Sequence, residues 1–208
     1  MTTATTGVGS MSAPARRTPI TLIAAVAVCV IGVGVWFGLS RTSRAPAGEF
    51  GQAPAFELID ASGARFSSES LRGKVWLVSF FFTSCESVCP MVIGKMGSLF
   101  ESAPRGMHFV SITIDPTRDT PLELKKYAER FDADPRRWHF LTGSPDVVRA
   151  VVTDGFKVAM PTGLHDLDRH SVRLILVDQE GDIRGYFSST DPDEMARLRG
   201  ILDVYRGS

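Results

Sequence analysis

The sequence predicts an α/β domain with a central mixed β-sheet and helices on both of its faces. Apolar runs of strand length alternate with segments whose apolar residues recur at helical spacing, and the pattern ends with a hairpin and a last helix. The most apolar of these runs, 74–82, ends just before two cysteines, and a helical pattern follows them. A buried strand that leads through a tight turn into a helix is therefore expected at the centre of the domain.

The other elements are predicted from periodicity and from turn residues. The expected strands are 55–59, 65–66, 74–82, 107–114, 138–141, 171–177 and 183–187. The expected helical segments are a single turn at 67–71 and helices at 90–100, 121–131, 145–152 and 191–204. Thr120 and Pro121 are typical of a helix start, and Ser144 is a second candidate cap.

The N-terminal quarter is predicted to contain a tail, a transmembrane helix and a linker. Residues 1–17 are mostly small and polar, which indicates a disordered tail. Residues 18–39 contain an uncharged apolar run that is long enough to cross a bilayer as a helix. Ser, Ala, Gly and Pro are frequent in 40–53, the expected linker, and 54–208 form the expected single folded domain.

This transmembrane anchor is expected to remain on the protein. The short leading tail favours an N-inside orientation, which predicts a single-pass protein of the inner (cytoplasmic) membrane with its C-terminal domain on the outer, periplasmic side. Ala45-Pro46-Ala47 resembles a cleavage site, so a signal sequence removed after Ala47 is the alternative. The length of the apolar run and the intervening Arg41 and Arg44 favour the anchor.

Composition limits the function classes. Lys and Arg number 23, as do Asp and Glu, so the net charge is zero and no basic surface for nucleic acid is expected. The chain has three cysteines, and Cys29 lies in the apolar N-terminal run. Cys85 and Cys89 are too few for a disulfide scaffold or for a zinc site of four cysteines. They are predicted to be a reactive or metal-ligating pair, with two buried structural thiols as the alternative.

Cys85 and Cys89 are expected at the start of the helix that follows the buried strand. Unpaired N–H groups and the helix dipole favour the thiolate form at such a position. Residues four apart on a helix share one face with Cβ atoms ~5–6 Å apart, which suits either a shared soft metal ion or a disulfide. A strand followed by two cysteines at a helix start is how a thioredoxin-like domain presents its thiols.

A third candidate ligand is His170, immediately before the expected strand 171–177. In a thioredoxin-like sheet this strand lies near the strand that precedes the cysteines, so its start is expected near the thiols. Two thiolates and an imidazole suit Cu(I), and they also hold Cu(II) when an oxygen ligand joins them. Zinc would need a further protein ligand, and no candidate residue lies at a sequence spacing typical of zinc sites.

Three blocks, in this order, resemble the Sco (Sco/SenC) family of membrane-anchored copper proteins of cytochrome oxidase assembly. The blocks are FFFTSCESVCP, VSITIDPTRDTPLELKKYAERF and DRHSVRLILVDQEGDI. The resemblance implies that Cys85, Cys89 and His170 bind copper and that Asp115 assists as an outer-shell group or an occasional oxygen ligand. Many members carry Pro where this chain has Glu86, and a carboxylate there is expected to disfavour a nearby thiolate.

The resemblance implies a metallochaperone that passes copper to the binuclear copper centre of an oxidase subunit, with no enzymatic turnover required. Another copper chaperone or a thiol reductase would be a further partner. The alternative function is a thiol–disulfide oxidoreductase that reduces the cysteines of that copper centre, because an activated thiolate beside a second thiol is sufficient for exchange.

Structural roles are expected for several neighbouring residues. Arg118 and Asp119 are expected to fasten their loop by local hydrogen bonds, and Met91 and Met96 to be core residues. Three other histidines have no partner at ligand spacing and are left out of the site; they are His108, His139 and His165. His165 is the one of these that merits checking, because it lies five residues before His170.

Overall fold

A computed structural model describes residues 50–160 and 172–206, and its strands form one seven-stranded sheet. The strands are β1 (Glu57–Asp60), β2 (Arg65–Ser67), β3 (Trp76–Phe81), β4 (His108–Thr113), β5 (Trp138–Thr142), β6 (Arg173–Val177) and β7 (Ile183–Ser188). Their spatial order is β2-β1-β5-β4-β3-β6-β7. Each predicted strand is present, with bounds that differ by one or two residues.

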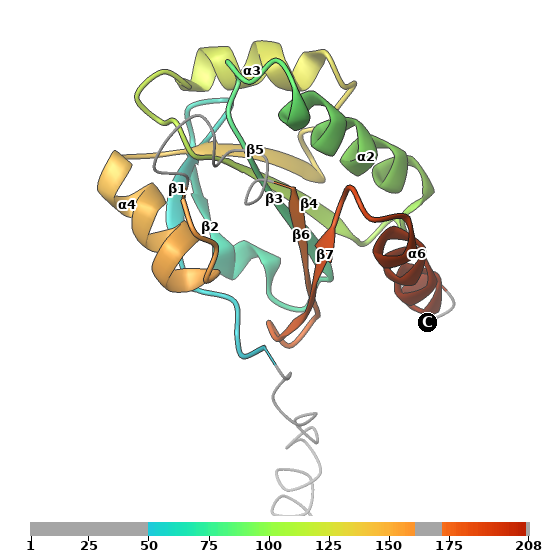
Figure 1. The fold of residues 1–208 in the computed structure, drawn as a ribbon. Helices are drawn as coiled ribbons and strands as arrows, with labels where there is room; N and C mark the ends of the chain where they lie inside the picture. Colours follow the sequence, from blue (N-terminus) through green and yellow to red (C-terminus); the bar gives the residue numbers. More distant parts are fainter. Residues whose placement is uncertain (1–49, 161–171, 207–208) are drawn as a thin grey trace, which may run out of the picture. The chain divides into compact units, whose positions relative to one another are not determined.

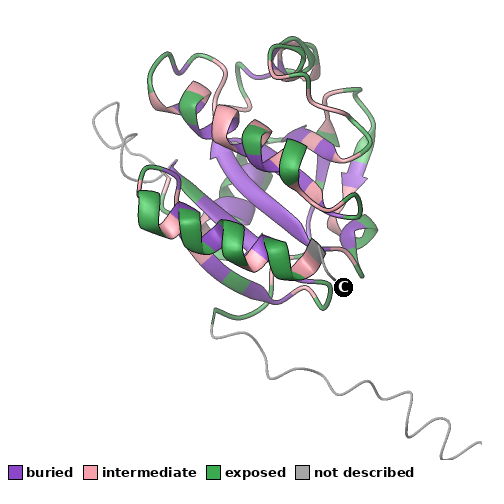
Figure 2. Ribbon diagram, turned by 90° about the vertical axis from the view of Figure 1, so that its right-hand side faces the viewer, coloured by how far each residue is buried: buried purple, intermediate pink, exposed green. Residues whose placement is uncertain are grey.

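The sheet is mixed, as predicted. β3, β4 and β5 are parallel neighbours at its centre, β6 and β7 are antiparallel on one side, and β1 and β2 are antiparallel on the other. All six residues of β3 are buried, because helices cover this central strand on both faces (Figure 2). A strand buried on both faces is expected to be a continuous apolar run, which is the pattern that identified it in the sequence.

The helices are divided between the two faces of the sheet (Figure 1). They are α2 (Val88–Ser102), α3 (Pro121–Glu129), α4 (Pro145–Arg149) and α6 (Pro192–Arg206), with a 3-10 turn η1 (Ser68–Leu71) and a π-helical segment η2 (Ala150–Gly155). Buried side chains of α2, α3 and α6 pack in one apolar cluster with one face of the sheet. Buried side chains of η1, α4 and η2 pack in a second cluster with the other face.

The first of these clusters contains both cysteines, and it corrects one expectation about α2. Met96 is fully buried there, as predicted, together with Val92 and Leu99. Met91 is 40% exposed, so the prediction that it is a core residue was wrong. Helical geometry explains the difference, because positions 92, 96 and 99 share a face and position 91 lies off it.

The folded unit includes the last residues of the predicted linker. Gln52 forms a bridge with Asp182, and Ala53 N–H donates to the carbonyl of Gly181. Residues 51–53 are thus attached to the β6–β7 turn, so the folded structure begins before residue 54. The predicted membrane anchor at 18–39 lies outside the described residues. Within the described residues, no helix is long and apolar enough to span a membrane.

Candidate thiol and metal site

The two cysteines lie at the point where β3 leads into α2. β3 ends at Phe81 and α2 begins at Val88, so Cys89 is in the first turn of the helix and Cys85 is in the preceding loop. The expectation that both cysteines share a helix face was therefore wrong. They are nevertheless brought together, because the loop bends back toward the helix start.

A hydrogen bond joins the two cysteines directly. The backbone N–H of Cys89 donates to Cys85 Sγ at 3.4 Å, and Ser87 Oγ lies 3.9 Å from the same sulfur. Ser87 occupies the N-cap position, yet its side chain makes no capping hydrogen bond. The first turn of a helix has N–H groups without a partner inside the helix, and Cys85 sulfur accepts one of them.

These contacts give the two thiols different pKa values. Burial acts to raise the pKa of Cys85, but the hydrogen bonds that it receives from Cys89 and Ser87 outweigh burial and hold its pKa below the ordinary value. Burial raises the pKa of Cys89 well above the ordinary value, and the hydrogen bond from its side chain to Cys85 adds to the effect. Glu86 is exposed, and the pKa of Cys85 is lowered despite it. Cys85 is thus the thiol that ionises first.

The loop that carries Cys85 is tied to a buried carboxylate from another block of the sequence. Thr83 donates to Asp119 twice, from its backbone N–H at 3.0 Å and from its hydroxyl. The hydroxyl of Thr113, the last residue of β4, also donates to Asp119. The prediction that Asp119 fastens its loop by local hydrogen bonds was incomplete, because two of its bonds reach the loop before Cys85.

Asp115 lies beside this cluster without a hydrogen bond to either cysteine. Its N–H donates to Thr113 Oγ1 at 3.0 Å, and its carbonyl accepts the N–H of Asp119 at 3.0 Å. Its carboxylate is 3.8 Å from the guanidinium of Arg118, which is largely exposed. The backbone of Asp115 therefore forms the turn, while its carboxylate remains at the surface near the thiol end of the sheet.

His170 lies outside the described residues, so its side chain is not placed relative to the thiols. The strand that follows it is placed: β6 runs antiparallel to β3, and Leu174 pairs with Ser79. The start of β6 consequently lies at the same end of the sheet as the end of β3, as predicted. Val172 is buried in the same cluster as both cysteines. Within residues 50–160 and 172–206, no three metal-binding side chains lie close together.

The sequence that forms this strand, thiol loop and helix matches the model of a known family. A model of the SCO1/SenC family matches residues 44–202, which is most of the chain and includes both cysteines. The chain belongs to the SCO1/SenC family. The SCO2-like protein of Rickettsia felis is 38% identical over 157 residues, covering 70% of this chain and 74% of that relative.

Solved structures of SCO1/SenC proteins share the fold. Yeast Sco1 with copper bound is 26% identical, with a TM-score of 0.59 over 76% of this chain and 94% of that one. A structure described as identifying a disulfide switch in BsSco, a member of the Sco family of cytochrome c oxidase assembly proteins, is 26% identical. Its TM-score is 0.60 over 73% of this chain and 94% of that one. Both the thioredoxin-like fold and the Sco resemblance are thus confirmed.

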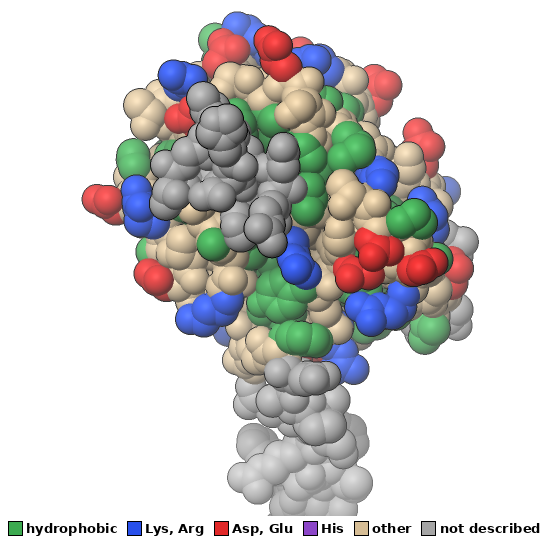
Figure 3. Space-filling model, viewed as in Figure 1, with side chains coloured by type: hydrophobic (Ala, Val, Ile, Leu, Met, Phe, Trp, Pro, Cys, Tyr) green, Lys and Arg blue, Asp and Glu red, His purple; other side chains and the backbone are tan. Residues whose placement is uncertain are grey.

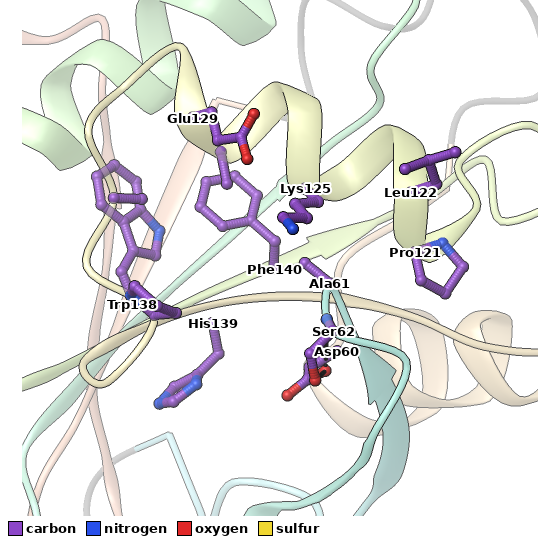
Figure 4. A pocket seen from close by; sticks show the side chains of 13 residues that line it. Asp60, Ala61, Ser62, Pro121, Leu122, Lys125, Glu129, Trp138, His139 and Phe140 are labelled. Carbon is purple, nitrogen blue, oxygen red and sulfur yellow. Dashed lines mark hydrogen bonds between the residues drawn. The ribbon is translucent and has the colours of Figure 1, made fainter.

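One pocket of this SCO1/SenC domain lies apart from the thiols. It has a volume of about 690 Å³ and lies between α3 on one side and the β1–β2 turn and β5 on the other (Figure 4). Its lining is mainly apolar, with Lys125 and Glu129 on α3 and Asp60 at the end of β1. Neither cysteine lines it.

On the face drawn in Figure 3, Lys and Arg side chains are interspersed with Asp and Glu.

Sequence reasoning missed one pair of histidines. His108 and His139 are far apart in the sequence but lie on the neighbouring strands β4 and β5. His108 Nδ1 is 3.3 Å from His139 Nε2, and the two rings are nearly parallel. Burial, followed by nearby positive charges, lowers the pKa of both imidazoles. The only signal in the sequence was that both stand at or near the start of a strand that joins a parallel sheet.

Proposed function

We propose that this chain binds one copper ion through Cys85, Cys89 and His170 and delivers it to the binuclear copper centre of cytochrome c oxidase during assembly. The observation that carries the proposal is the meeting of the two thiols at the end of β3, where Cys85 Sγ is 3.4 Å from the backbone nitrogen of Cys89. The membership of the SCO1/SenC family supports it, as does the copper bound in the yeast Sco1 structure.

The donor set fits copper better than the other common metals. Thiolates are soft ligands that favour Cu(I), and an imidazole with an added oxygen ligand also permits Cu(II). Both thiols must lose their protons to bind a metal. Cys85, with its lowered pKa, loses its proton more readily than Cys89, whose raised pKa favours the protonated thiol until the metal binds. Incoming thiolates of the acceptor then replace Cys85 and Cys89 stepwise, which releases the copper.

We propose that the domain is held at the membrane while it delivers copper. The apolar run at 18–39 is proposed as an uncleaved inner-membrane anchor, with the folded domain on the outer side and residues 40–50 as a tether. The acceptor is proposed to be the copper-centre subunit of the oxidase. Another copper chaperone or a thiol reductase would load or reduce this protein.

The proposal is tested by copper transfer. The reduced full chain in detergent is loaded with Cu(I) and mixed with the soluble copper-centre domain of an oxidase subunit, the two proteins are separated, and the copper content of each is measured. We expect transfer from the wild type and none from Cys85→Ser or Cys89→Ser. If the reduced wild type binds no copper above background, the proposal fails.

The unequal acidity of the thiols favours thiol–disulfide exchange as a second candidate function. The Cys85 thiolate would attack a disulfide of the copper-centre subunit to form a mixed disulfide, which releases one target thiolate. The Cys89 thiol would lose its proton and attack Cys85 Sγ, which releases the second. The target gains two electrons and this chain becomes the Cys85–Cys89 disulfide. A reductase assay with an oxidised copper-centre peptide separates this role from metal delivery, because it requires no copper and no His170.

A further inference from the structure

The carboxylate of Asp119 is the point where two of the three sequence blocks meet. It accepts hydrogen bonds from Thr83, two residues before Cys85, and from Thr113 at the end of β4. Thr113 and Phe81 are partners in the parallel pairing of β4 with β3, so the carboxylate bridges the ends of two adjacent strands. The Cys85 loop therefore has one side-chain anchor outside its own segment, 36 residues away in the sequence.

Asp119 is buried without a balancing charge. Its exposed fraction is 0%, as is that of Thr113. Within residues 50–160 and 172–206 no Lys or Arg forms an ion pair with it, and the neighbouring Arg118 is paired with Asp115 instead. A buried carboxylate in this setting is stabilised by the hydrogen bonds it accepts. Three such bonds from two threonines supply that stabilisation.

We propose that Asp119 is a positioning residue for the thiol pair. By holding both the backbone N–H and the hydroxyl of Thr83, it fixes the turn that leads to Cys85. The sulfur of Cys85 then stays within reach of the N–H of Cys89 at the start of α2. This inference deepens the proposed function, because the same geometry presents both sulfurs to one metal ion.

The hydrogen bonds and the charge of Asp119 can be separated by substitution. In Asp119→Asn the carbonyl oxygen can take the place of Oδ2, which accepts from Thr83 N–H and Thr113 Oγ1. The amide NH₂ then faces Thr83 Oγ1, and a hydroxyl can accept as well as donate. Asn therefore keeps all three contacts and removes the charge, whereas Asp119→Ala removes all three acceptors.

The first readout needs no copper. In the reduced full chain in detergent micelles, the exchange of the Cys89 amide with deuterium is followed by NMR. That amide has no acceptor inside the helix, so its protection reports the bond to Cys85 Sγ. We expect Asp119→Ala to speed its exchange about fivefold or more, and Asp119→Asn to leave it near the wild-type rate. The amide of Leu99, deep in α2, is the internal control for an intact fold.

The second readout is Cu(I) affinity, measured by competition with a chromophoric chelator. Loss of an outer hydrogen-bonding partner of a metal ligand typically weakens affinity by ~10–100-fold. We expect a loss in this range for Asp119→Ala and near wild-type affinity for Asp119→Asn. If Asn impairs both readouts as much as Ala does, the charge acts and the positioning role is wrong. If Ala changes neither readout, the role is also wrong.

A milder pair of variants covers the case in which Asp119→Ala does not fold. Thr113→Val removes one donor from Asp119 and the acceptor of the Asp115 N–H, while it keeps the β-branched shape, and we expect faster exchange of the Cys89 amide. Thr142→Val is the matched control, because Thr142 is a buried strand threonine whose hydroxyl has no hydrogen-bond partner in the described structure. Equal effects of the two valines would contradict the inference. If the wild type bound no copper but the exchange results held, the proposed function would fail while the positioning role remained.

Discussion

Cys85 acts as the cap of the helix that carries Cys89. Its sulfur accepts the Cys89 N–H at 3.4 Å, while Ser87, at the N-cap position, makes no capping bond with its side chain. Acceptance of a backbone N–H at a helix start stabilises the thiolate form of Cys85. The same contact holds the loop of Cys85 against the helix that carries Cys89, so it contributes both to the lowered pKa of Cys85 and to the pairing of the two thiols.

The two thiols are expected to react at different rates. With limiting iodoacetamide at neutral pH, Cys85 is modified before Cys89, because its pKa is lowered while that of Cys89 is raised and Cys89 is fully buried. Mass spectrometry of the digested chain measures the order. Cys89→Ser keeps the backbone donor, so Cys85 should stay reactive in this control. Modification of Cys89 first would contradict the assignment.

The lowered pKa of Cys85 also has a consequence for stability. Because the folded pKa lies below the unfolded value, the thiolate contributes stability above the unfolded pKa of about 8.5, and that contribution is lost as the pH falls through the folded pKa. Urea unfolding of the reduced wild type and Cys85→Ser, compared between neutral and alkaline pH, measures it. As the pH rises, the free energy of unfolding of the wild type should increase relative to that of Cys85→Ser.

Acid is expected to destabilise the domain through His139. Burial, followed by the charge of His108, lowers its pKa to about 4, so the unfolded chain binds a proton at a higher pH than the folded chain does. Asp60 opposes this shift, while Lys74 adds to it. The contribution is complete above about pH 6.5 and is lost between there and about pH 4.

The size of this effect is on the order of 1–2 kcal/mol, reduced from the full shift because the ring is only partly buried. Chemical denaturation of the wild type and His139→Asn at pH 7 and pH 5 measures it. The wild type should lose more stability than the variant on acidification. Equal losses would show that the pKa of His139 does not differ between the folded and the unfolded chain.

Tyr127 carries a buried hydroxyl without a hydrogen-bond partner among the described residues. Its ring stacks on Phe81 with centroids 5.2 Å apart. Tyr127→Phe keeps the stack and removes an unpaired polar group, so we expect the copper-free protein to be unchanged or more stable by up to about 1 kcal/mol. Thermal unfolding tests this. A loss of 2 kcal/mol or more, on the scale of a broken buried hydrogen bond, would mean that the hydroxyl has a partner.

Met96 and Met91 provide a matched pair on one helix. Met96→Ala should cost about 2–5 kcal/mol, because it leaves a cavity in the cluster that contains both cysteines. Met91→Ala should cost less than about 1 kcal/mol, since this side chain is 40% exposed. Urea denaturation compares them. Copper affinity should be unchanged in Met91→Ala, and a large loss would reveal a thioether ligand that the present account leaves out.

Sequence patterns predicted the strands, and the placement of both cysteines after β3, because these depend on local signals. The apolar run of β3 indicated a strand buried on both faces, and the order of the blocks placed the start of β6 at the thiol end. The position of Cys85 outside α2 could not be read locally. It depends on the tie from Thr83 to Asp119, which is fixed only when β3 and β4 pair. The His108–His139 contact was missed for the same reason.

The proposed copper site joins Cys85, Cys89 and His170. The most direct test is a titration of the reduced full chain in detergent with Cu(I) and Cu(II), comparing the wild type with His170→Ala and, as a matched control from the same stretch, His165→Ala. We expect one copper per chain and a Cu(II)–thiolate absorption band in the wild type and in His165→Ala, with the band lost in His170→Ala. An unchanged band in His170→Ala, or no binding by the wild type, would contradict the proposed site.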